Sequence, residues 1–139
     1  GPSGLASAVV RLAAARTNFA FETTLSSRSF APWLAMLGRR GYHVHLLFLW
    51  LESPDLAVNR VAERVRLGGH DVPEVVVRRR YEKGLRNLFG QYMPLAERWQ
   101  IFDNSQTTGP RLIASGAQRV VESVDHMAVW QKVTEGYHD

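Results

Sequence analysis

The sequence predicts an α/β fold in three layers, with helices on both faces of a mostly parallel sheet. The nearly continuous apolar run 42–51 follows a glycine and has the composition of a strand that is buried on both faces. Two shorter strand-like runs, 19–21 and 99–104, lie on either side of it along the chain. Segments with helical spacing separate these runs, and such alternation favours parallel strands that are joined by helical crossovers.

The first half of the chain is predicted to run helix, strand, helix, strand. Residues 5–15 have apolar side chains at helical spacing and predict a helix before the strand at 19–21. Apolar residues recur at intervals of three and four from Phe30 to Leu37, which defines one face of a second helix. The serines within 26–29 offer side-chain oxygens that could cap this helix. The buried strand 42–51 follows it.

The second half is predicted to contain two basic helices, two strands and a closing helix. Ser53 and Pro54 supply an N-cap and a first-turn proline, so we expect a helix from there to the Gly68-Gly69 bend. Another helix is expected to begin near Pro73 and to break around Gly90. The remaining predicted elements are strands at 99–104 and 110–114 and a C-terminal helix within 117–139, from Ala117 to about Lys132.

The composition indicates one ordinary globular domain over residues 1–139. Hydrophobic residues make up 45% of the chain and charged residues 22%, and no cysteine is present. No stretch is long and apolar enough to predict a membrane span, and no signal-peptide pattern is visible. We therefore expect a cytoplasmic protein that has neither disulfides nor a membrane partner.

Arginine carries nearly all of the positive charge. The formal net charge is +4, and Lys83 and Lys132 are the only lysines among the 17 basic residues. Because guanidinium groups pair bidentately with phosphate, this bias favours a phosphorylated small-molecule ligand, although a GC-rich genome explains it equally well. The sequence pI of about 10.0 also makes nucleic acid a candidate ligand. No nucleic-acid-binding motif accompanies that charge and acidic residues are interspersed, so we do not expect a nucleic-acid partner.

Candidate ligand-binding residues follow the predicted strands, because ligands of open parallel sheets bind outside the carboxyl ends of the strands. Glu22 and Thr24 share a parity along the first strand and could orient a substrate hydroxyl, with Arg28 close behind. Alternatively, Glu22 and Thr24 form a polar turn and a helix cap. Asp103 and Asn104 end a later strand, where such residues commonly close turns.

A second group of candidates surrounds the Gly68-Gly69 bend. Arginines placed on both sides of a flexible bend suit a lid that closes over a nucleotide and brings guanidinium groups onto phosphate oxygens. The alternative is a solvated basic helix face, and for Arg66 a favourable interaction with the helix dipole. The residues of this group are Arg60, Arg64, Arg66, His70, Arg78, Arg79 and Arg80.

His43 and His45 alternate on one strand and could place two imidazoles on one face as metal ligands. No acidic or cysteine partner follows at a convincing spacing, so we favour a structural role and expect no metal site. The chain also contains no Gly-x-Ser-x-Gly elbow and no His-Glu-x-x-His helix, which removes the usual support for a hydrolase or a metalloenzyme.

Four segments, in order and sensibly spaced, resemble the zeta-toxin-like family of P-loop kinases. The resemblance spans about residues 5–115 and is far more specific than any single motif. Its segments are Phe19–Ser26, which contains Glu22-x-Thr24, the strand Gly41–Leu49, the run Arg64–Pro73, and Arg79–Phe89. It implies a kinase that binds ATP and magnesium and phosphorylates a small hydroxyl-bearing substrate, such as a UDP-linked amino sugar.

The resemblance also implies roles for individual residues. Glu22 and Thr24 match the family's Glu-x-Thr substrate element, and Arg28 is assigned to the same region. Arg64 falls on the lid helix and His70 near a second lid position, which makes them the candidate catalytic residues. The residues assigned to nucleotide binding are Arg66, Arg80, Asp103 and Asn104.

The chain departs from the family's pattern at its start. Family members open with a strand, a Gly-x-x-x-x-Gly-Lys-Ser/Thr loop and a catalytic aspartate, whereas Gly1-Pro2-Ser3-Gly4 echoes only the first half of such a loop. We therefore expect an N-terminally truncated kinase domain without kinase activity on its own. The alternative is a non-catalytic remnant that binds a protein such as an antitoxin, or another copy of itself, through a sheet edge exposed by the missing strand.

Overall fold

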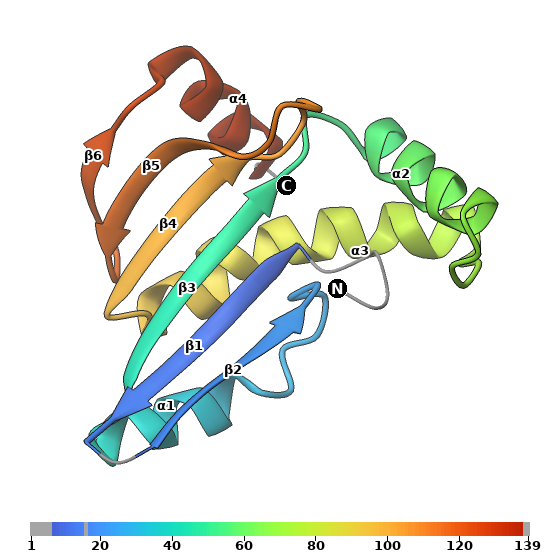
Figure 1. Cartoon of the computed structure of the whole chain (residues 1–139). Helices are drawn as coiled ribbons and strands as arrows, with labels where there is room; N and C mark the ends of the chain where they lie inside the picture. Colours follow the sequence, from blue (N-terminus) through green and yellow to red (C-terminus); the bar gives the residue numbers. More distant parts are fainter. Residues whose placement is uncertain (1–6, 16, 138–139) are drawn as a thin grey trace.

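The computed structural model describes residues 7–15 and 17–137 and shows one six-stranded sheet with helices packed against it (Figure 1). The strands are β1 (Ala8–Ala14), β2 (Thr17–Thr23), β3 (His43–Trp50), β4 (Arg98–Asp103), β5 (Arg111–Ala117) and β6 (Val120–Val124). The helices are α1 (Ala31–Arg39), α2 (Pro54–Arg66), α3 (Glu74–Asn87) and α4 (Met127–Tyr137), and α3 continues into the π-helical turn η1 (Leu88–Tyr92) and the 3-10 turn η2 (Met93–Leu95).

The sheet is mixed, with the strand order β2-β1-β3-β4-β5-β6. Among the described strands, β3 and β4 form the only parallel pair, and β1 is antiparallel to both β2 and β3. The prediction of a mostly parallel sheet is therefore wrong for these residues. However, β2, β3 and β4 all run in the same direction, because β1 lies between β2 and β3 and reverses the direction twice. Their carboxyl ends consequently lie at one edge of the sheet, as the sequence predicted.

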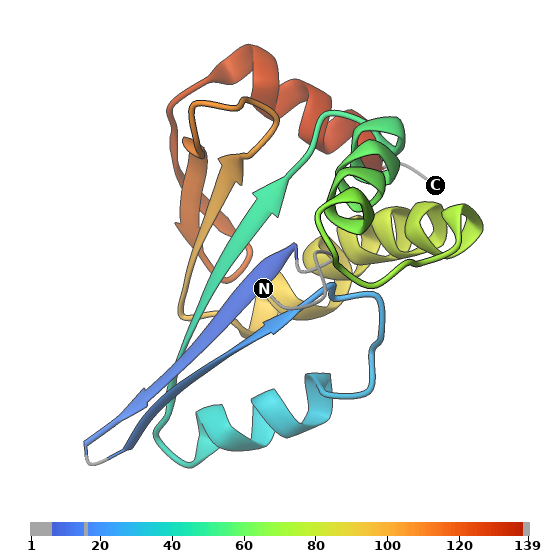
Figure 2. The same ribbon diagram turned by 45° about the vertical axis from the view of Figure 1, so that its right-hand side comes forward.

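The helices that the structure describes cover one face of the sheet, which gives two layers and not the predicted three (Figures 1 and 2). On β3, Val44, Leu46, Phe48 and Trp50 are buried against the helices, while the residues between them are more exposed. This alternation is typical of a sheet that packs on one side only. The apolar composition of 42–51 predicted that both faces of this strand would be buried. One of its faces is less buried than expected.

The hydrophobic core lies between the sheet and the helices α1, α3 and α4. The largest side chains in it include Trp99 of β4 and Tyr92 of the π-helical turn. The Trp99 ring stacks on Trp130 of α4 with 6.2 Å between ring centroids, and its Nε1 donates a hydrogen bond to the Gln118 carbonyl oxygen. The Tyr92 hydroxyl donates to the carbonyl oxygen of Ser27 and so joins the core to the loop after β2.

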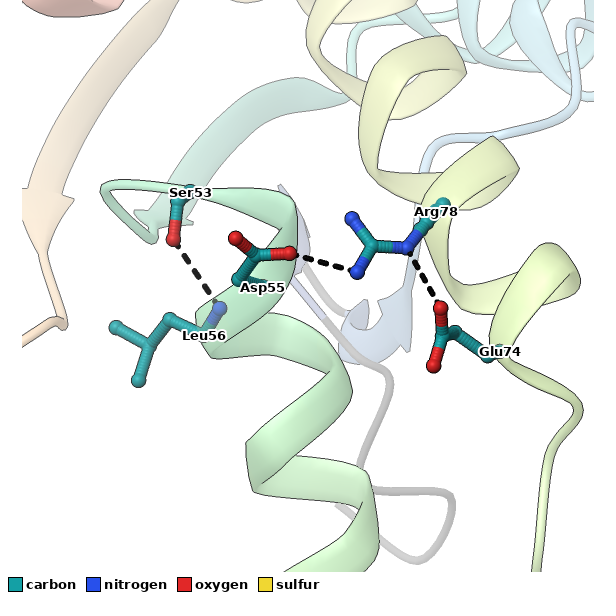
Figure 3. A network of polar contacts seen from close by, with 5 residues as sticks. All are labelled: Ser53, Asp55, Leu56, Glu74 and Arg78. Carbon is teal, nitrogen blue, oxygen red and sulfur yellow. Dashed lines mark hydrogen bonds and ion pairs between the residues drawn. The ribbon is translucent and has the colours of Figure 1, made fainter.

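Most predicted elements of the middle of the chain are confirmed. The described strands β2, β3, β4 and β5 and the helices α1, α2 and α3 lie where the sequence placed them, within a few residues. Ser53 is the N-cap of α2 and accepts a hydrogen bond from the backbone nitrogen of Leu56 at 3.1 Å (Figure 3). The serines at 26–29 do not cap α1, because its N-cap residue is Phe30 and no side chain bonds to the first turn.

Two predicted helices are wrong where they fall on described residues. The helix expected at 5–15 is the strand β1, which pairs on both sides along its length; residues 5 and 6 lie outside the described residues. The helix expected to begin at Ala117 is replaced by a two-residue turn, the strand β6 and the shorter helix α4. The helix α4 is the only part of that prediction that remains.

No helix of the described residues has the length and apolar character that crossing a membrane requires.

Candidate functional site

A pocket of about 320 Å³ opens at the carboxyl ends of β3 and β4, beside α2 and α3. Its floor is apolar and includes Phe48, Trp50 and Leu85, while polar side chains surround it. A concave, largely apolar site with a few convergent polar groups has the character of a small-molecule site. The polar residues that line it are Ser7, Thr24, Arg60, Glu63, Arg64, Arg80, Tyr81 and Asn104.

The pocket brings together several residues that the sequence singled out for ligand binding. Five of the predicted candidates line it: Thr24, Arg60, Arg64, Arg80 and Asn104. They come from the loop after β2, from α2, from α3 and from the end of β4, so segments distant in the sequence meet here. The meeting follows from the common direction of β2, β3 and β4.

Three arginines give the pocket its positive character. Arg60 and Arg64 are one turn apart on α2, and Arg80 lies on α3 opposite them. The Arg60 guanidinium donates to the carbonyl oxygens of Asn104 at 2.9 Å and Ser105 at 3.2 Å, which ties α2 to the end of β4. Arg80 is half-buried and makes no hydrogen bond or ion pair with any residue that the structure describes.

The hydroxyl side of the pocket comes from Ser7 and Thr24. The Ser7 hydroxyl donates to the Thr24 carbonyl oxygen at 3.2 Å, and the Thr24 hydroxyl lies 2.7 Å from that of Ser26. Gly84 of α3 also meets Thr24, because a Cβ at this glycine would lie 2.5 Å from the Thr24 carbonyl oxygen. The backbone at Thr24 is thus held between β1 and α3, which fixes where its hydroxyl can be.

Tyr81 closes the pocket between α3 and the end of β3. Its hydroxyl donates to the Leu51 carbonyl oxygen at 2.7 Å. Burial, and to a lesser degree the charge of Glu52, raises the pKa of Tyr81 from 10.0 to about 12. The phenol is therefore neutral at physiological pH and acts as a hydrogen-bond donor rather than as a base.

Seven of the predicted candidates are not part of the pocket lining, Arg78 and Arg79 of α3 among them. Arg66 forms an exposed ion pair with Glu63 on the same helix, with 2.6 Å between Nη2 and Oε1. Asp103 is buried at the end of β4, where it accepts from the Ser105 backbone nitrogen at 3.0 Å and pairs with Arg111 at 3.4 Å. Glu22, Arg28 and His70 are exposed and also lie outside the lining. Asp103 thus has the turn-closing contacts that were the alternative to nucleotide binding.

An ion-pair network joins the two basic helices (Figure 3). Arg78 of α3 donates to Asp55 of α2 at 2.6 Å and to Glu74 of its own helix at 3.1 Å. These hydrogen bonds, the one to Asp55 first, raise the pKa of Arg78 above its ordinary value. Both acids are exposed, so each pair contributes little stability. These two carboxylates offset the positive charge of Arg78, which does not line the pocket.

The two strand histidines lie on β3. His43 pairs with Glu97, which precedes β4, through Nδ1 and Oε2, both side chains being exposed. Within 7–15 and 17–137, no three His, Cys, Asp or Glu side chains form a group that could hold a metal ion. The structural role expected of these histidines stays a prediction.

Sequence reasoning missed three polar residues of the pocket, Ser7, Glu63 and Tyr81. Ser7 was placed in a helix, and only the period-two pattern of the residues after it could have indicated a strand. Tyr81 lies on the helix expected after Pro73, where sequence reasoning assigned it no role in the site. Its spacing of four from Val77 and Leu85, which also line the pocket, was the available signal.

Comparisons with known proteins give one relative of limited extent. An uncharacterized protein of Haemophilus influenzae is 32% identical over 63 residues, which is 45% of this chain. The chain likewise spans 45% of the length of that relative. No family model matches the sequence, and no solved structure matches it. The resemblance to zeta-toxin-like kinases therefore remains a prediction.

Proposed function

We propose that the pocket binds a phosphorylated small molecule, and that the chain provides the substrate and lid elements of a zeta-toxin-like P-loop kinase. In such a kinase the γ-phosphate of ATP passes to a hydroxyl of a small substrate, for example a UDP-linked amino sugar. The observation that carries the proposal is the convergence of Arg60, Arg64 and Arg80 with the Thr24 hydroxyl in one pocket.

The charges of the pocket support an anionic ligand. Arginines that share a concave site repel one another unless an anion lies between them, and guanidinium groups pair well with phosphate oxygens. Arg60 is already engaged with backbone carbonyls, and Glu63, which also lines the pocket, is paired with Arg66. Arg80 has no partner among the described residues, so it is the group best placed to take a phosphate oxygen.

The positions of the other residues support distinct roles. Thr24 lines the pocket from the loop after β2, and its hydroxyl can orient the hydroxyl of an acceptor. Arg64 lies four residues before the Gly68-Gly69 bend, where a movement of the lid would bring it over the ligand. The candidate roles of Glu22, Arg28, Arg66 and His70 rest on the resemblance alone.

The proposed binding rests on arginines and not on a metal. When bound, magnesium in such kinases neutralises phosphate charge, but the described residues supply no group of three metal ligands and do not fit a magnesium site of their own. Residues 1–139 also contain no Gly-x-x-x-x-Gly-Lys-Ser/Thr sequence. We therefore expect ligand binding without ATP turnover by this polypeptide.

Isothermal titration tests the proposal with UDP-N-acetylglucosamine and, separately, with ATP and magnesium. Arg64→Ala and Arg80→Ala should each weaken binding about tenfold, because a hydrogen bond to a charged group contributes about 1.5 kcal/mol or more. Arg119→Ala is the matched control, since Arg119 is exposed in the turn between β5 and β6 and lies far along the chain from the pocket residues. Absence of binding at millimolar ligand, or equal affinities in all three variants, would contradict the proposal.

A second candidate function, a non-catalytic module for protein binding or self-association, is favoured by the edge strand β6. Val120 and Val121 of this strand are 62% and 44% exposed, and unpaired edge strands are templates for pairing with another chain. Light scattering at micromolar concentration should then show a dimer that Val121→Lys disrupts. Val75→Lys, at an exposed valine of α3, is the control. A monomer in every sample would exclude self-association through this edge.

A further inference from the structure

The uncovered face of the sheet carries a hollow of about 280 Å³ that is separate from the pocket. It lies over β1, β3, β4 and β5, and its residues differ from all of those that line the pocket. The helices of the described residues lie against the opposite face of the sheet (Figure 2). The polar side chains that line the hollow are Arg11, His45, Arg98, Gln100 and Ser115.

Three of these side chains form a row across neighbouring strands. Arg11 of β1 is directly opposite His45 of β3, and His45 is in register with Arg98 of β4. Residues in register on adjacent strands point to the same face, and like charges in such positions are unfavourable. The two arginines thus lie on either side of one imidazole, and their Cα atoms are about 10 Å apart, which is two strand spacings.

Among the described residues, acidic partners engage only part of this row. Arg98 pairs with Glu122 of β6 at 3.1 Å, but the two side chains are 68% and 47% exposed, so the pair is readily exchanged. Glu97, next to Arg98 along the chain, is paired with His43. Glu22 of β2 is in register with Val9, which lies on the same face of β1 as Arg11. The side chain of Arg11 makes no hydrogen bond or ion pair with any described residue. Gln100 and Ser115, which are in register with each other on β4 and β5, add neutral donors beside the row.

We propose that this hollow is a second anion site, which binds a phosphate group through Arg11, His45 and Arg98. A carboxylate can be satisfied by one bidentate arginine, whereas a phosphate has further oxygens for a second guanidinium and an imidazole. A site whose donors lie on three adjacent strands therefore favours phosphate over carboxylate as its ligand. The Gln100 amide and the Ser115 hydroxyl donate to the remaining oxygens or to the group that carries the phosphate.

A nuclear magnetic resonance titration with inorganic phosphate tests the site, with acetate as the second probe and ionic strength held constant. Phosphate should shift the backbone amide signals of Arg11, His45 and Gln100. Arg11→Gln and Arg98→Gln should each raise the dissociation constant for phosphate at least tenfold. Acetate should bind at least tenfold more weakly than phosphate.

Two control variants distinguish this site from the pocket and from general charge effects. Arg39→Gln removes an exposed arginine at the end of α1, and Arg80→Gln removes a pocket arginine. Neither should change the signals of β1 and β4 or the dissociation constant measured from them. Arg11→Lys keeps the charge without the bidentate fork and should retain intermediate affinity, which also checks the position if Arg11→Gln does not fold.

Several outcomes would overturn the proposal. These are unshifted amide signals on β1, β3 and β4, equal affinity in Arg11→Gln and the unmodified chain, or acetate that binds as tightly as phosphate. A phosphate response abolished by Arg80→Gln alone would show that the anion occupies the pocket and not the hollow. The outcome for the hollow is thus independent of the binding proposed for the pocket.

Discussion

One buried hydrogen bond joins the loop that carries Thr24 to α3. Asn87 of α3 donates from Nδ2 to the Leu25 carbonyl oxygen at 2.7 Å, and the two residues are 4% and 0% exposed. Leu25 has a φ of 58°, a left-handed conformation that is unfavourable for a leucine. The strained backbone is held by the burial of the leucine side chain and by the Asn87 amide. Replacing Asn87 with alanine should therefore weaken the whole loop.

The cost of Asn87→Ala follows from the unsatisfied carbonyl. Leaving a buried acceptor without its donor costs about 1–3 kcal/mol, and a value of about 2 kcal/mol is reasonable for a neutral pair. With an unfolding entropy of about 2.1 cal/mol/K per residue over 139 residues, this loss lowers Tm by about 7 °C. Because Thr24 precedes the strained residue, the affinity of the pocket for its ligand should fall as well.

Urea denaturation and thermal melting measure this effect against Asn59→Ala. Asn59 is exposed on α2, so both substitutions exchange asparagine for alanine in a helix and share the same gain in helix propensity. The difference between the two variants isolates the buried hydrogen bond. If Asn87→Ala is as stable as Asn59→Ala within about 0.5 kcal/mol, the amide does not hold the loop, and this reasoning about Leu25 is wrong.

Two further predictions concern α3. Gly84→Ala should destabilise the fold and weaken ligand binding, because the new Cβ would lie 2.5 Å from the Thr24 carbonyl oxygen. Gly90→Ala is the control and should do neither, because a Cβ there would have nothing within 4 Å. Denaturation and ligand titration of both variants check this. Burial raises the pKa of Tyr81 to about 12, so the phenol ionises at lower pH in the unfolded chain than in the folded one. The stability that the neutral phenol contributes is therefore complete below pH 10 and falls as the pH rises towards 12. Tyr81→Phe should therefore lose less stability than the unmodified chain between pH 9 and pH 11, and an equal loss in urea denaturation at the two pH values would contradict the assignment.

The position of the pocket could be predicted from the sequence because it depends on strand direction more than on sheet order. The strands β2, β3 and β4 were identified from their apolar composition, and a common direction was inferred from the helical segments between them. That inference is correct for these three strands although the sheet as a whole is mixed. It placed Thr24 and Asn104 at one edge before any contact was known.

The errors arose where local propensity and the final structure disagree. The run AVVRLAA of β1 is rich in residues that favour helices, yet pairing with two strands overrides that preference. In the turn between β5 and β6, Gln118 has a φ of 52°, a conformation usually signalled by glycine or asparagine. Without that signal, the residues after Ala117 were read as the start of a helix.

The residues around the bend show what composition can and cannot establish. Composition identified a group of arginines on two helices, and three of them, Arg60, Arg64 and Arg80, line the pocket. Which members face the pocket depends on the rotation of each helix and on acidic partners, and these come from packing: Glu63 holds Arg66 on the outer face, and Asp55 holds Arg78. Arg64 and Arg80 line the pocket from α2 and α3, two helices that pack against each other.

The strand β1, the element whose structure was predicted wrongly, connects the two proposed anion sites. At its start, Ser7 accepts a hydrogen bond from the Leu49 backbone nitrogen at 2.6 Å and donates one to the Thr24 carbonyl oxygen, so it forms part of the pocket wall. Four residues later, Arg11 projects from the opposite face of the sheet into the hollow. Pairing of β1 with β2 and β3 is therefore a condition for both sites. Any influence that loosens this strand should weaken both, while the arginines of α2 and α3 affect the pocket alone.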